Sequence, residues 1–376
     1  MPEQLRAVVV GAGWAGEGHT KALQWCGVEV VAICARRPDV VRQVADRLGV
    51  AEASADWRET IERLEPDIVS LATPGGLRLD VVEAAAGRGC HILCDKPLAP
   101  DAATAERVYR AAEAAGVKHA YAATHRYGPQ VAWLAELVRE GAVGRVREIV
   151  GTFRTNLPAL IPWSWALNAG DGGGWLNNGF THHLGIMAAV SGGEPLRAMG
   201  RVDVRHSRAP VLPDIHDFRQ AMASGRALTP EAARDLEWRD YEADLGFAAL
   251  VDYSSPSGVV PATVVLGPGT PPSGEVNGWR VYGEEGTLQT EAGPPPAVSR
   301  HRAGAEPEPL PIPQRLLDDV PQVGDNVQNW WCALARDFVA DVRGEPHRPY
   351  LTFRDGSRYQ VAIDAVRAGT WRELPG

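Results

Sequence analysis

The sequence is poor in the features that mark secreted, membrane and nucleic-acid-binding proteins. It has five cysteines in 376 residues, an odd and sparse set that argues against a disulfide framework and favours a reducing compartment. No apolar run approaches the length of a membrane span, and the first residues lack the pattern of a signal peptide. The 38 basic and 47 acidic residues give a net charge of −9, which argues against general nucleic-acid binding. We therefore expect a cytoplasmic protein that acts without a membrane or a nucleic acid.

The length and the order of the predicted elements indicate two domains. A chain of 376 residues is longer than one typical hydrophobic core supports. Up to about residue 124, continuous apolar strands alternate with helices, which predicts a doubly wound parallel sheet covered on both faces. Beyond a helix near 129–140, longer alternating strands predict a large, mostly antiparallel open sheet. We therefore divide the chain into an N-terminal α/β domain over 1–124 and a C-terminal α+β domain over 125–376.

Individual elements of the C-terminal domain can also be placed. The predicted strands cover 146–154, 198–204, 244–253, 259–266 and 278–290, and a final helical pair covers 325–343 and 355–367. Proline-rich stretches at 294–296 and 306–313 predict loops or an edge excursion of the sheet. The stretch 204–241 is rich in charge and looks like an insertion that forms a lid or an oligomer contact; it contains His206, His216 and Trp238.

A glycine-rich motif follows the first predicted strand. Gly11, Gly13 and Gly16 form a G-x-G-x-x-G pattern between an apolar strand and a helical segment. The first glycine permits a tight turn, the second lets the backbone approach a pyrophosphate, and the third lets the helix pack closely on the sheet. The helix begins near Trp14 and Ala15, and its N-terminus offers free N–H groups and a positive dipole end. We predict that this loop binds the phosphates of a dinucleotide.

The end of the second predicted strand bears on which dinucleotide binds. A fold that prefers NAD usually places Asp or Glu there to hold the ribose 2′-hydroxyl. This chain instead has Ala35, Arg36 and Arg37, and two guanidinium groups can grip a 2′-phosphate. The arginines could also point into solvent or cover the adenine. We predict a preference for NADP over NAD.

Further motifs occur in an order that is typical of one enzyme family. After the glycine loop come His19, Ala72-Thr73-Pro74, Asp95-Lys96-Pro97-Leu98, His125-Arg126-Tyr127-Gly128-Pro129, Gly141-Ala142-Val143-Gly144, Gly172-Gly173-Gly174-Trp175-Leu176 and Thr352-Phe353-Arg354-Asp355-Gly356. With these motifs the chain resembles the Gfo/Idh/MocA oxidoreductases, such as glucose–fructose oxidoreductase and inositol dehydrogenase, over nearly its whole length. The resemblance implies an NAD(P)-binding Rossmann domain. It also implies hydride transfer between nicotinamide and a secondary alcohol or ketone of a sugar, glycoside or cyclitol.

Lys96 is the residue that we expect to assist this chemistry. A lysine at a strand end, beside a nicotinamide and followed by proline, can be partly desolvated and held rigid. Its ammonium group can then polarise a substrate oxygen while hydride moves at the adjacent carbon. In the family the Lys-Pro peptide is often cis, which sets the same expectation for Lys96 and Pro97. The resemblance also implies cofactor contacts from Thr73, Pro74 and Asp95.

The second catalytic segment departs from the pattern of its relatives. Typical members carry Asp after the glycines and His four residues later, whereas this chain has Asn178 and His182. On a helix the two side chains share a face, so Asn178 could orient the imidazole without adding charge, or it could contact substrate. His182 is the predicted proton acceptor. His183 points elsewhere on the helix, where it packs structurally or joins the substrate contacts. Relatives often carry His where this chain has Arg78, whose role stays open between a cofactor contact, an acidic substrate group and a solvated charge.

Tryptophans near this segment suggest the kind of ligand. Trp163, Trp165 and Trp175 offer flat apolar faces that suit a sugar or cyclitol ring, although core or interface packing is an equal alternative for each. Arg126 and Tyr127 complete the expected substrate contacts.

Two other functions remain open from the sequence. One is a redox-neutral NAD-dependent glycosidase or epimerase that keeps its cofactor bound, and the other is a cofactor-binding protein that has lost its chemistry. No metal is expected, because the histidines near His125 lack a fitting carboxylate or thiolate, and Cys90 and Cys94 have the spacing of a buried strand. We expect a homo-oligomer, a dimer or tetramer formed through the C-terminal sheet.

Overall fold

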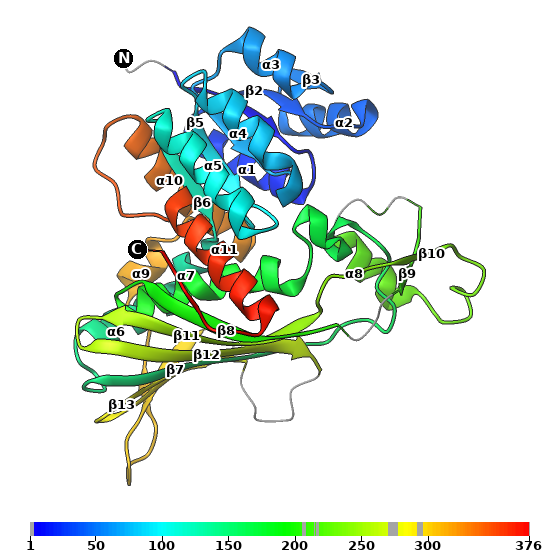
Figure 1. The fold of residues 1–376 in the computed structure, drawn as a ribbon. Helices are drawn as coiled ribbons and strands as arrows, with labels where there is room; N and C mark the ends of the chain where they lie inside the picture. Colours follow the sequence, from blue (N-terminus) through cyan, green and yellow to red (C-terminus); the bar gives the residue numbers. More distant parts are fainter. Residues whose placement is uncertain are drawn as a thin grey trace. The chain divides into compact units, whose positions relative to one another are not determined.

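The computed structural model describes residues 4–204, 208–213, 215, 218–269, 277–291 and 296–375. The chain forms two compact units (Figure 1). The first contains residues 1–124, 170–172 and 321–360, and the second contains residues 125–169, 173–320 and 361–376. His206 and His216 lie outside the described residues.

A six-stranded parallel sheet forms the centre of the first unit. Its strands are β1 (Arg6–Val10), β2 (Glu29–Cys34), β3 (Glu52–Ser54), β4 (Ile68–Leu71), β5 (His91–Asp95) and β6 (His119–Ala122). They lie in the order β3-β2-β1-β4-β5-β6, and every neighbouring pair is parallel. The order runs away from β1 in both directions, so the switch point at which a doubly wound sheet binds its ligand falls between β1 and β4. The predicted fold of this unit is confirmed.

Helices cover the sheet of the first unit on both faces, as apolar parallel strands require. They are α1 (Trp14–Trp25), α2 (Pro38–Leu48), α3 (Trp57–Leu64), η1 (Gly75–Leu77), α4 (Arg78–Ala86), α5 (Ala102–Ala114), α10 (Asn326–Val342) and the first half of α11 (Phe353–Ala368). Helix α10 packs on α1, where the rings of Trp14 and Trp331 lie 4.8 Å apart. A Cβ atom at Gly18 would lie 2.1 Å from Trp331, so glycine is needed at this contact.

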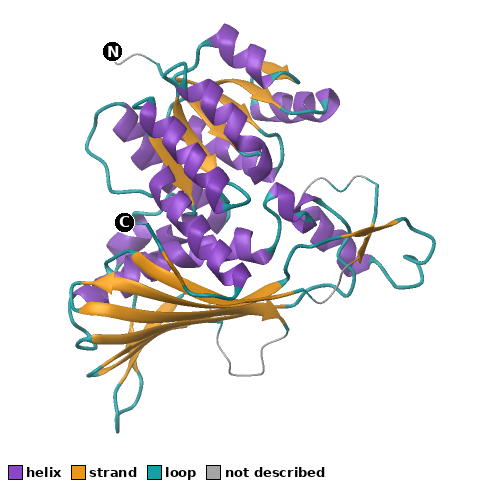
Figure 2. Ribbon diagram, viewed as in Figure 1, coloured by secondary structure: helices purple, strands orange, loops and turns teal. Residues whose placement is uncertain are grey.

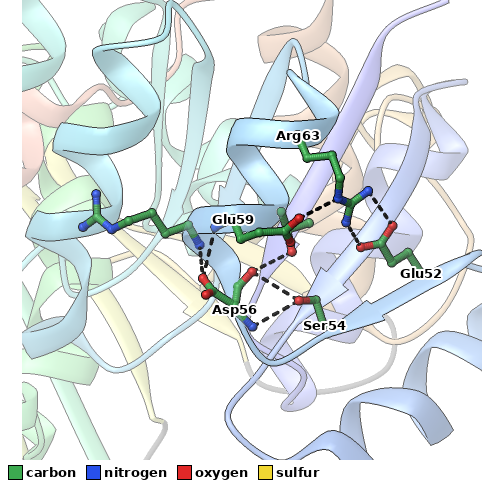
Figure 3. A network of polar contacts seen from close by, with 7 residues as sticks. Glu52, Ser54, Asp56, Glu59 and Arg63 are labelled. Atoms are coloured by element: carbon green, nitrogen blue, oxygen red, sulfur yellow. Dashed lines mark hydrogen bonds and ion pairs between the residues drawn. The ribbon is translucent and has the colours of Figure 1, made fainter.

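Helix α3 shows how a local sequence signal fixes an element boundary (Figure 3). Asp56 caps the helix, and its side chain accepts hydrogen bonds from the backbone N–H groups of Arg58 and Glu59, both at 3.0 Å. Arg63 then joins Glu59, at 2.7 Å, to Glu52 on β3. The cap satisfies N–H groups that would otherwise lack partners at the helix start.

The second unit is built on a nine-stranded sheet (Figure 2). Its strands are β7 (Val146–Thr155), β8 (Pro195–Asp203), β11 (Gly246–Ser255), β12 (Gly258–Pro268), β13 (Gly278–Gly283), β14 (Gly286–Glu291), β15 (Ala297–His301), β16 (Glu308–Leu310) and β17 (Arg372–Glu373). Their order is β16-β15-β14-β13-β7-β12-β11-β8-β17, and among the described strands of this sheet only β7 and β12 pair in parallel. Helices α6 (Pro129–Arg139) and α7 (Thr181–Ser191) pack on this sheet. The expected mostly antiparallel open sheet is confirmed.

Several elements differ from the sequence-based placement. The single strand predicted at 278–290 is wrong, because a turn at Glu284 and Glu285 divides it into β13 and β14. The proline-rich stretch at 306–313 contributes β16 at the sheet edge, where a strand can accommodate proline. Within 204–241, β9 (Arg208–Pro210) and β10 (Trp238–Asp240) pair as a two-stranded sheet beside α8 (Phe218–Ala227). Short elements of this kind carry too little periodicity to be found from sequence.

Candidate active site

The glycine loop of the first unit has the shape that a dinucleotide requires. Gly11 has φ +121, and a Cβ atom there would lie 2.6 Å from the carbonyl oxygen of Ala72. A Cβ atom at Gly16 would lie 1.9 Å from the carbonyl oxygen of Gly11. The turn and the helix can therefore approach each other this closely only because both residues are glycine. Gly13 differs, because no atom of the described residues, apart from its own and its chain neighbours', lies within 4 Å of its Cβ position. Two glycines thus serve the fold, and the third leaves open space at the start of α1.

The start of α1 leaves backbone donors for a ligand. Gly13 is the N-cap residue and has no side chain to satisfy the first N–H groups of the helix. The positive end of the helix dipole therefore faces the open space beside Gly13. These features fit the pyrophosphate of a dinucleotide.

The other predicted cofactor contacts lie at the same edge of the sheet, because the strands are parallel. Ala35, Arg36 and Arg37 follow β2, and both arginine side chains are exposed. Thr73 and Pro74 follow β4, and the buried Oγ1 atom of Thr73 has no hydrogen-bond partner within the described protein. A buried hydroxyl without a partner is costly, and a bound ligand would satisfy it.

Lys96 follows β5 directly and is partly exposed. The Lys96–Pro97 peptide bond is cis, as expected. Burial lowers the pKa of the Lys96 amine, the carboxylate of Asp95 opposes this effect, and the charge of Arg78 lowers the pKa further. The net result is an amine that releases its proton more readily than an exposed lysine does. Such a group suits proton transfer to or from an oxygen.

Asp95 lies beside Lys96 and contacts a buried histidine. His19 on α1 is fully buried; its Nδ1 lies 2.9 Å from Ser70 Oγ, and its Nε2 lies 3.8 Å from Asp95 Oδ1. Burial alone would raise the pKa of Asp95, but its close contact with His19 and the charge of Lys96 together hold that pKa below its ordinary value. Asp95 therefore stays ionised beside Lys96.

The second unit carries the other predicted catalytic residue on a distorted helix. The π-helix η5 (Leu176–Phe180) precedes α7, and the glycines before it allow a close approach. Gly174 has φ +94, and a Cβ atom there would lie 2.5 Å from Oδ2 of Asp244. Oδ1 of Asp244 accepts a hydrogen bond from Leu176 N at 2.8 Å. Asp244 therefore anchors the start of the segment.

Asp244 is buried, with 5% of its surface exposed. Burial raises its pKa to about 6, and the backbone N–H groups that it accepts from limit the rise. Sequence reasoning missed Asp244, because it lies nearly 70 positions from the segment that it holds, and no local motif marks it.

The two adjacent histidines of α7 lie in different surroundings. His182 is 6% exposed and stacks on His125, with ring centroids 3.7 Å apart and planes inclined by 6°. His183 stacks on Phe153 at 4.4 Å and approaches Trp279 at 5.4 Å. Burial and the charge of His125 lower the pKa of His183 to about 3. His183 therefore stays neutral inside an aromatic cluster.

The remaining predicted contacts also lie in the second unit. Asn178 donates its side-chain Nδ2 to Gly174 O at 2.9 Å. Trp163 and Trp175 pack against a small apolar cluster made of Leu167, Ala209, Tyr241 and Leu245. Arg126, Tyr127 and Trp165 are partly exposed. Trp163 and Trp175 thus have the packing role that the sequence left open as an alternative to substrate binding.

The structure also bears on metal binding and on membrane insertion. Within the described ranges, no group of three or more His, Cys, Asp or Glu side chains is arranged to hold a metal ion. In the same part of the chain, no helix combines the length and apolar character that crossing a bilayer requires.

Comparisons with known proteins identify the family of the chain. The family model described as "Oxidoreductase family, NAD-binding Rossmann fold" matches residues 5–123, and the "GFO/IDH/MocA C-terminal domain" matches residues 131–289. The chain therefore belongs to the Gfo/Idh/MocA family of oxidoreductases.

Individual relatives are similar over part of their length. A levoglucosan dehydrogenase from Pseudarthrobacter phenanthrenivorans is 28% identical over 51% of this chain and 52% of its own. An inositol 2-dehydrogenase from Arthrobacter sp. is 34% identical over 39% of this chain and 44% of its own. The chain spans about half the length of these curated relatives. The solved structure titled "Levoglucosan dehydrogenase, complex with NADH and levoglucosan" has the same fold, with a TM-score of 0.78 at 20% identity over 100% of both chains.

Proposed function

We propose that this protein is an NAD(P)-dependent dehydrogenase that interconverts a secondary alcohol and a ketone on a sugar, glycoside or cyclitol. The observation that carries the proposal is the arrangement at one edge of the parallel sheet. There the glycine loop after β1 is shaped for a dinucleotide, and Lys96 follows β5 with a lowered amine pKa. Relatives named for levoglucosan and inositol support the substrate class.

The proposed role of Lys96 is to handle the proton of the substrate oxygen. Bound NAD(P)H or its oxidised form would supply or accept the hydride at the adjacent carbon. The ionised carboxylate of Asp95 favours the charged ammonium form of Lys96, whereas burial and the charge of Arg78 favour the neutral amine. An amine with a lowered pKa gives up its proton to an oxygen, or takes one back, more easily than an exposed lysine does.

The proposed role of His182 is that of a proton acceptor. Its neighbour His183 is held neutral by burial, and the stacked His125 limits how His182 can turn. Asn178 contributes no charge, because it has replaced the aspartate of typical relatives. We further propose a preference for NADP, self-association through the nine-stranded sheet, and a cytoplasmic location.

Replacing Lys96 with alanine tests the central role. We expect turnover to fall by about two to four orders of magnitude, because an acid–base group is lost. The affinity for the dinucleotide should stay nearly unchanged, since the stabilisation arises mainly in the transition state. Steady-state assays with a panel of pyranosides and inositols, together with cofactor titration by fluorescence, measure both quantities.

Lys118→Ala is the matched control, because Lys118 precedes β6 and pairs with Asp341 at 2.8 Å. Full activity of Lys96→Ala would refute the role. Product formation without stoichiometric NAD(P)H would instead favour the redox-neutral glycosidase or epimerase.

A further inference from the structure

Arg78, the first residue of α4, is fully buried although it carries a charge. Only 1% of its surface is exposed. Arginine is almost never buried to this extent unless its donors are satisfied. Of the roles that the sequence left open for Arg78, that of a solvated charge is therefore wrong.

Every N–H group of the Arg78 guanidinium donates to a backbone carbonyl. Nε and Nη2 donate to Thr73 O at 3.0 and 2.5 Å, and Nη2 also donates to Lys96 O at 3.3 Å. Nη1 donates to the carbonyl oxygens of Asp95 and Pro97. These five bonds use the full donor capacity of the side chain. One planar group thus ties the end of β4 to the end of β5.

The hydrogen-bond acceptors of Arg78 are uncharged carbonyl oxygens, so they do not neutralise its positive charge. That charge therefore acts on neighbouring ionisable groups. Throughout the described residues, Arg78 forms no ion pair with a carboxylate within 4 Å. Among the described residues, Arg78 from α4 and Asp95 from β5 act on the Lys96 amine through their charges, and His19 from α1 contacts Asp95 in turn. Arg78 disfavours the ammonium form of Lys96, and Asp95 favours it.

We propose that Arg78 is a positioning residue for Lys96: its guanidinium fixes the carbonyls on both sides of the Lys96 backbone and places a buried positive charge next to that residue. The effect of Arg78 on catalysis rests on the proposed function. Its effect on the protonation of Lys96 does not. Histidine, which relatives often carry at this position, has at most two N–H donors and cannot make the same set of bonds.

The test measures the titration of Lys96 in the cofactor-free protein. Competitive labelling of Lys96 Nζ with acetic anhydride, followed by mass spectrometry across a pH series, gives the midpoint of that amine. In Arg78→Met the positive charge is absent, and we expect the midpoint to rise by roughly one pH unit. In Arg78→Lys a positive charge remains, so the midpoint should stay near that of the unmodified protein. Arg88→Met is the control, because Arg88 is exposed and pairs with Glu62.

An unchanged midpoint in folded Arg78→Met would overturn the proposal. If Arg78→Met does not fold, Arg78→His serves instead, since a neutral imidazole at alkaline pH should also raise the midpoint. An unchanged midpoint in that variant would equally overturn the proposal.

The pH profile of kcat/KM separates this inference from the proposed function. If Lys96 acts in catalysis, the limb that reports its titration should move upward in Arg78→Met by the same amount as the labelling midpoint. A labelling midpoint that moves while Lys96→Ala retains full activity would support the inference about Arg78 and refute the role of Lys96.

Discussion

His182 and His183 are neighbours in sequence, but their surroundings give them different chemistry. His183 is enclosed by Phe153 and Trp279, and its pKa falls to about 3 because burial disfavours the imidazolium. A group with so low a pKa is a poor proton acceptor near neutral pH. His182, stacked on His125, is therefore the stronger candidate.

Paired substitutions test this choice. His182→Gln should lower kcat by about two to four orders of magnitude, the usual range for a lost acid–base group. His183→Phe keeps an aromatic ring in the cluster and should retain activity within about tenfold of the unmodified enzyme. Steady-state kinetics at several pH values make the comparison. An active His182→Gln beside an inactive His183→Phe would show that the wrong histidine was chosen.

Arg36 and Arg37 give a second prediction at the scale of single residues. Both side chains are exposed after β2, where the 2′ position of a bound ribose lies in this fold. Replacing both with glutamine should weaken NADP binding at least about tenfold more than NAD binding, because charge-assisted bonds to a phosphate are lost. Dissociation constants measured for both dinucleotides decide the matter.

Arg42→Gln is the control for this pair, since Arg42 lies on α2 and faces Asp46. Equal losses for the two cofactors in the double variant would contradict the predicted preference.

At the scale of elements, the start of the segment η5–α7 depends on one buried carboxyl group. Asp244 accepts from Leu176 N, and its pKa is raised to about 6 by burial. An unfolded aspartate titrates near pH 4, so the folded state binds more protons between about pH 4 and pH 6. By linkage, the contribution of Asp244 to stability falls as the pH rises through this window.

Asp244→Asn should therefore gain stability relative to the unmodified protein as the pH rises from about 4 to 7, by up to roughly 3 kcal/mol. Asparagine keeps an acceptor for Leu176 N and cannot ionise. Asp244→Ala also cannot ionise but removes the acceptor, so it should be less stable than Asp244→Asn by about 1–3 kcal/mol at every pH. Denaturant unfolding at several pH values gives these differences. A difference between asparagine and aspartate that does not vary with pH would contradict the prediction.

At the scale of the whole molecule, the nine-stranded sheet has one face that its own helices leave exposed. Leu250, Val259 and Tyr282 point to this face, with 41%, 58% and 38% of their surfaces exposed. Strand register places Leu250 opposite Thr263 and Met199 on the same face. Apolar side chains grouped on a sheet face are typical of a protein–protein contact.

Leu250→Asp should therefore lower the molar mass measured by light scattering after size-exclusion chromatography, because a charge would be buried in the contact between copies. Val323→Asp is the control, since Val323 is also exposed, at 45%, but belongs to the other compact unit. A monomeric unmodified protein, or an oligomer unaffected by Leu250→Asp, would contradict the proposed contact.

The parts of this protein that the sequence determined are those with local causes. Strand and helix periodicity predicted both sheets, and the glycines at 11, 13 and 16 predicted the dinucleotide loop, because backbone geometry at a turn depends on few neighbours. The motifs around Lys96 and His182 indicated the family, which the comparisons confirmed.

Only the tertiary structure decided the surroundings of these residues. In the folded chain Arg78 donates a hydrogen bond to Lys96 O, and Asp244 accepts one from Leu176 N at the start of η5. His183 packs among aromatic rings. Helix α10 packs on α1, more than 300 positions away in the chain. Burial, pKa and hydrogen-bond partners arise from contacts between distant segments, and a single sequence records which residues exist but not which of them meet.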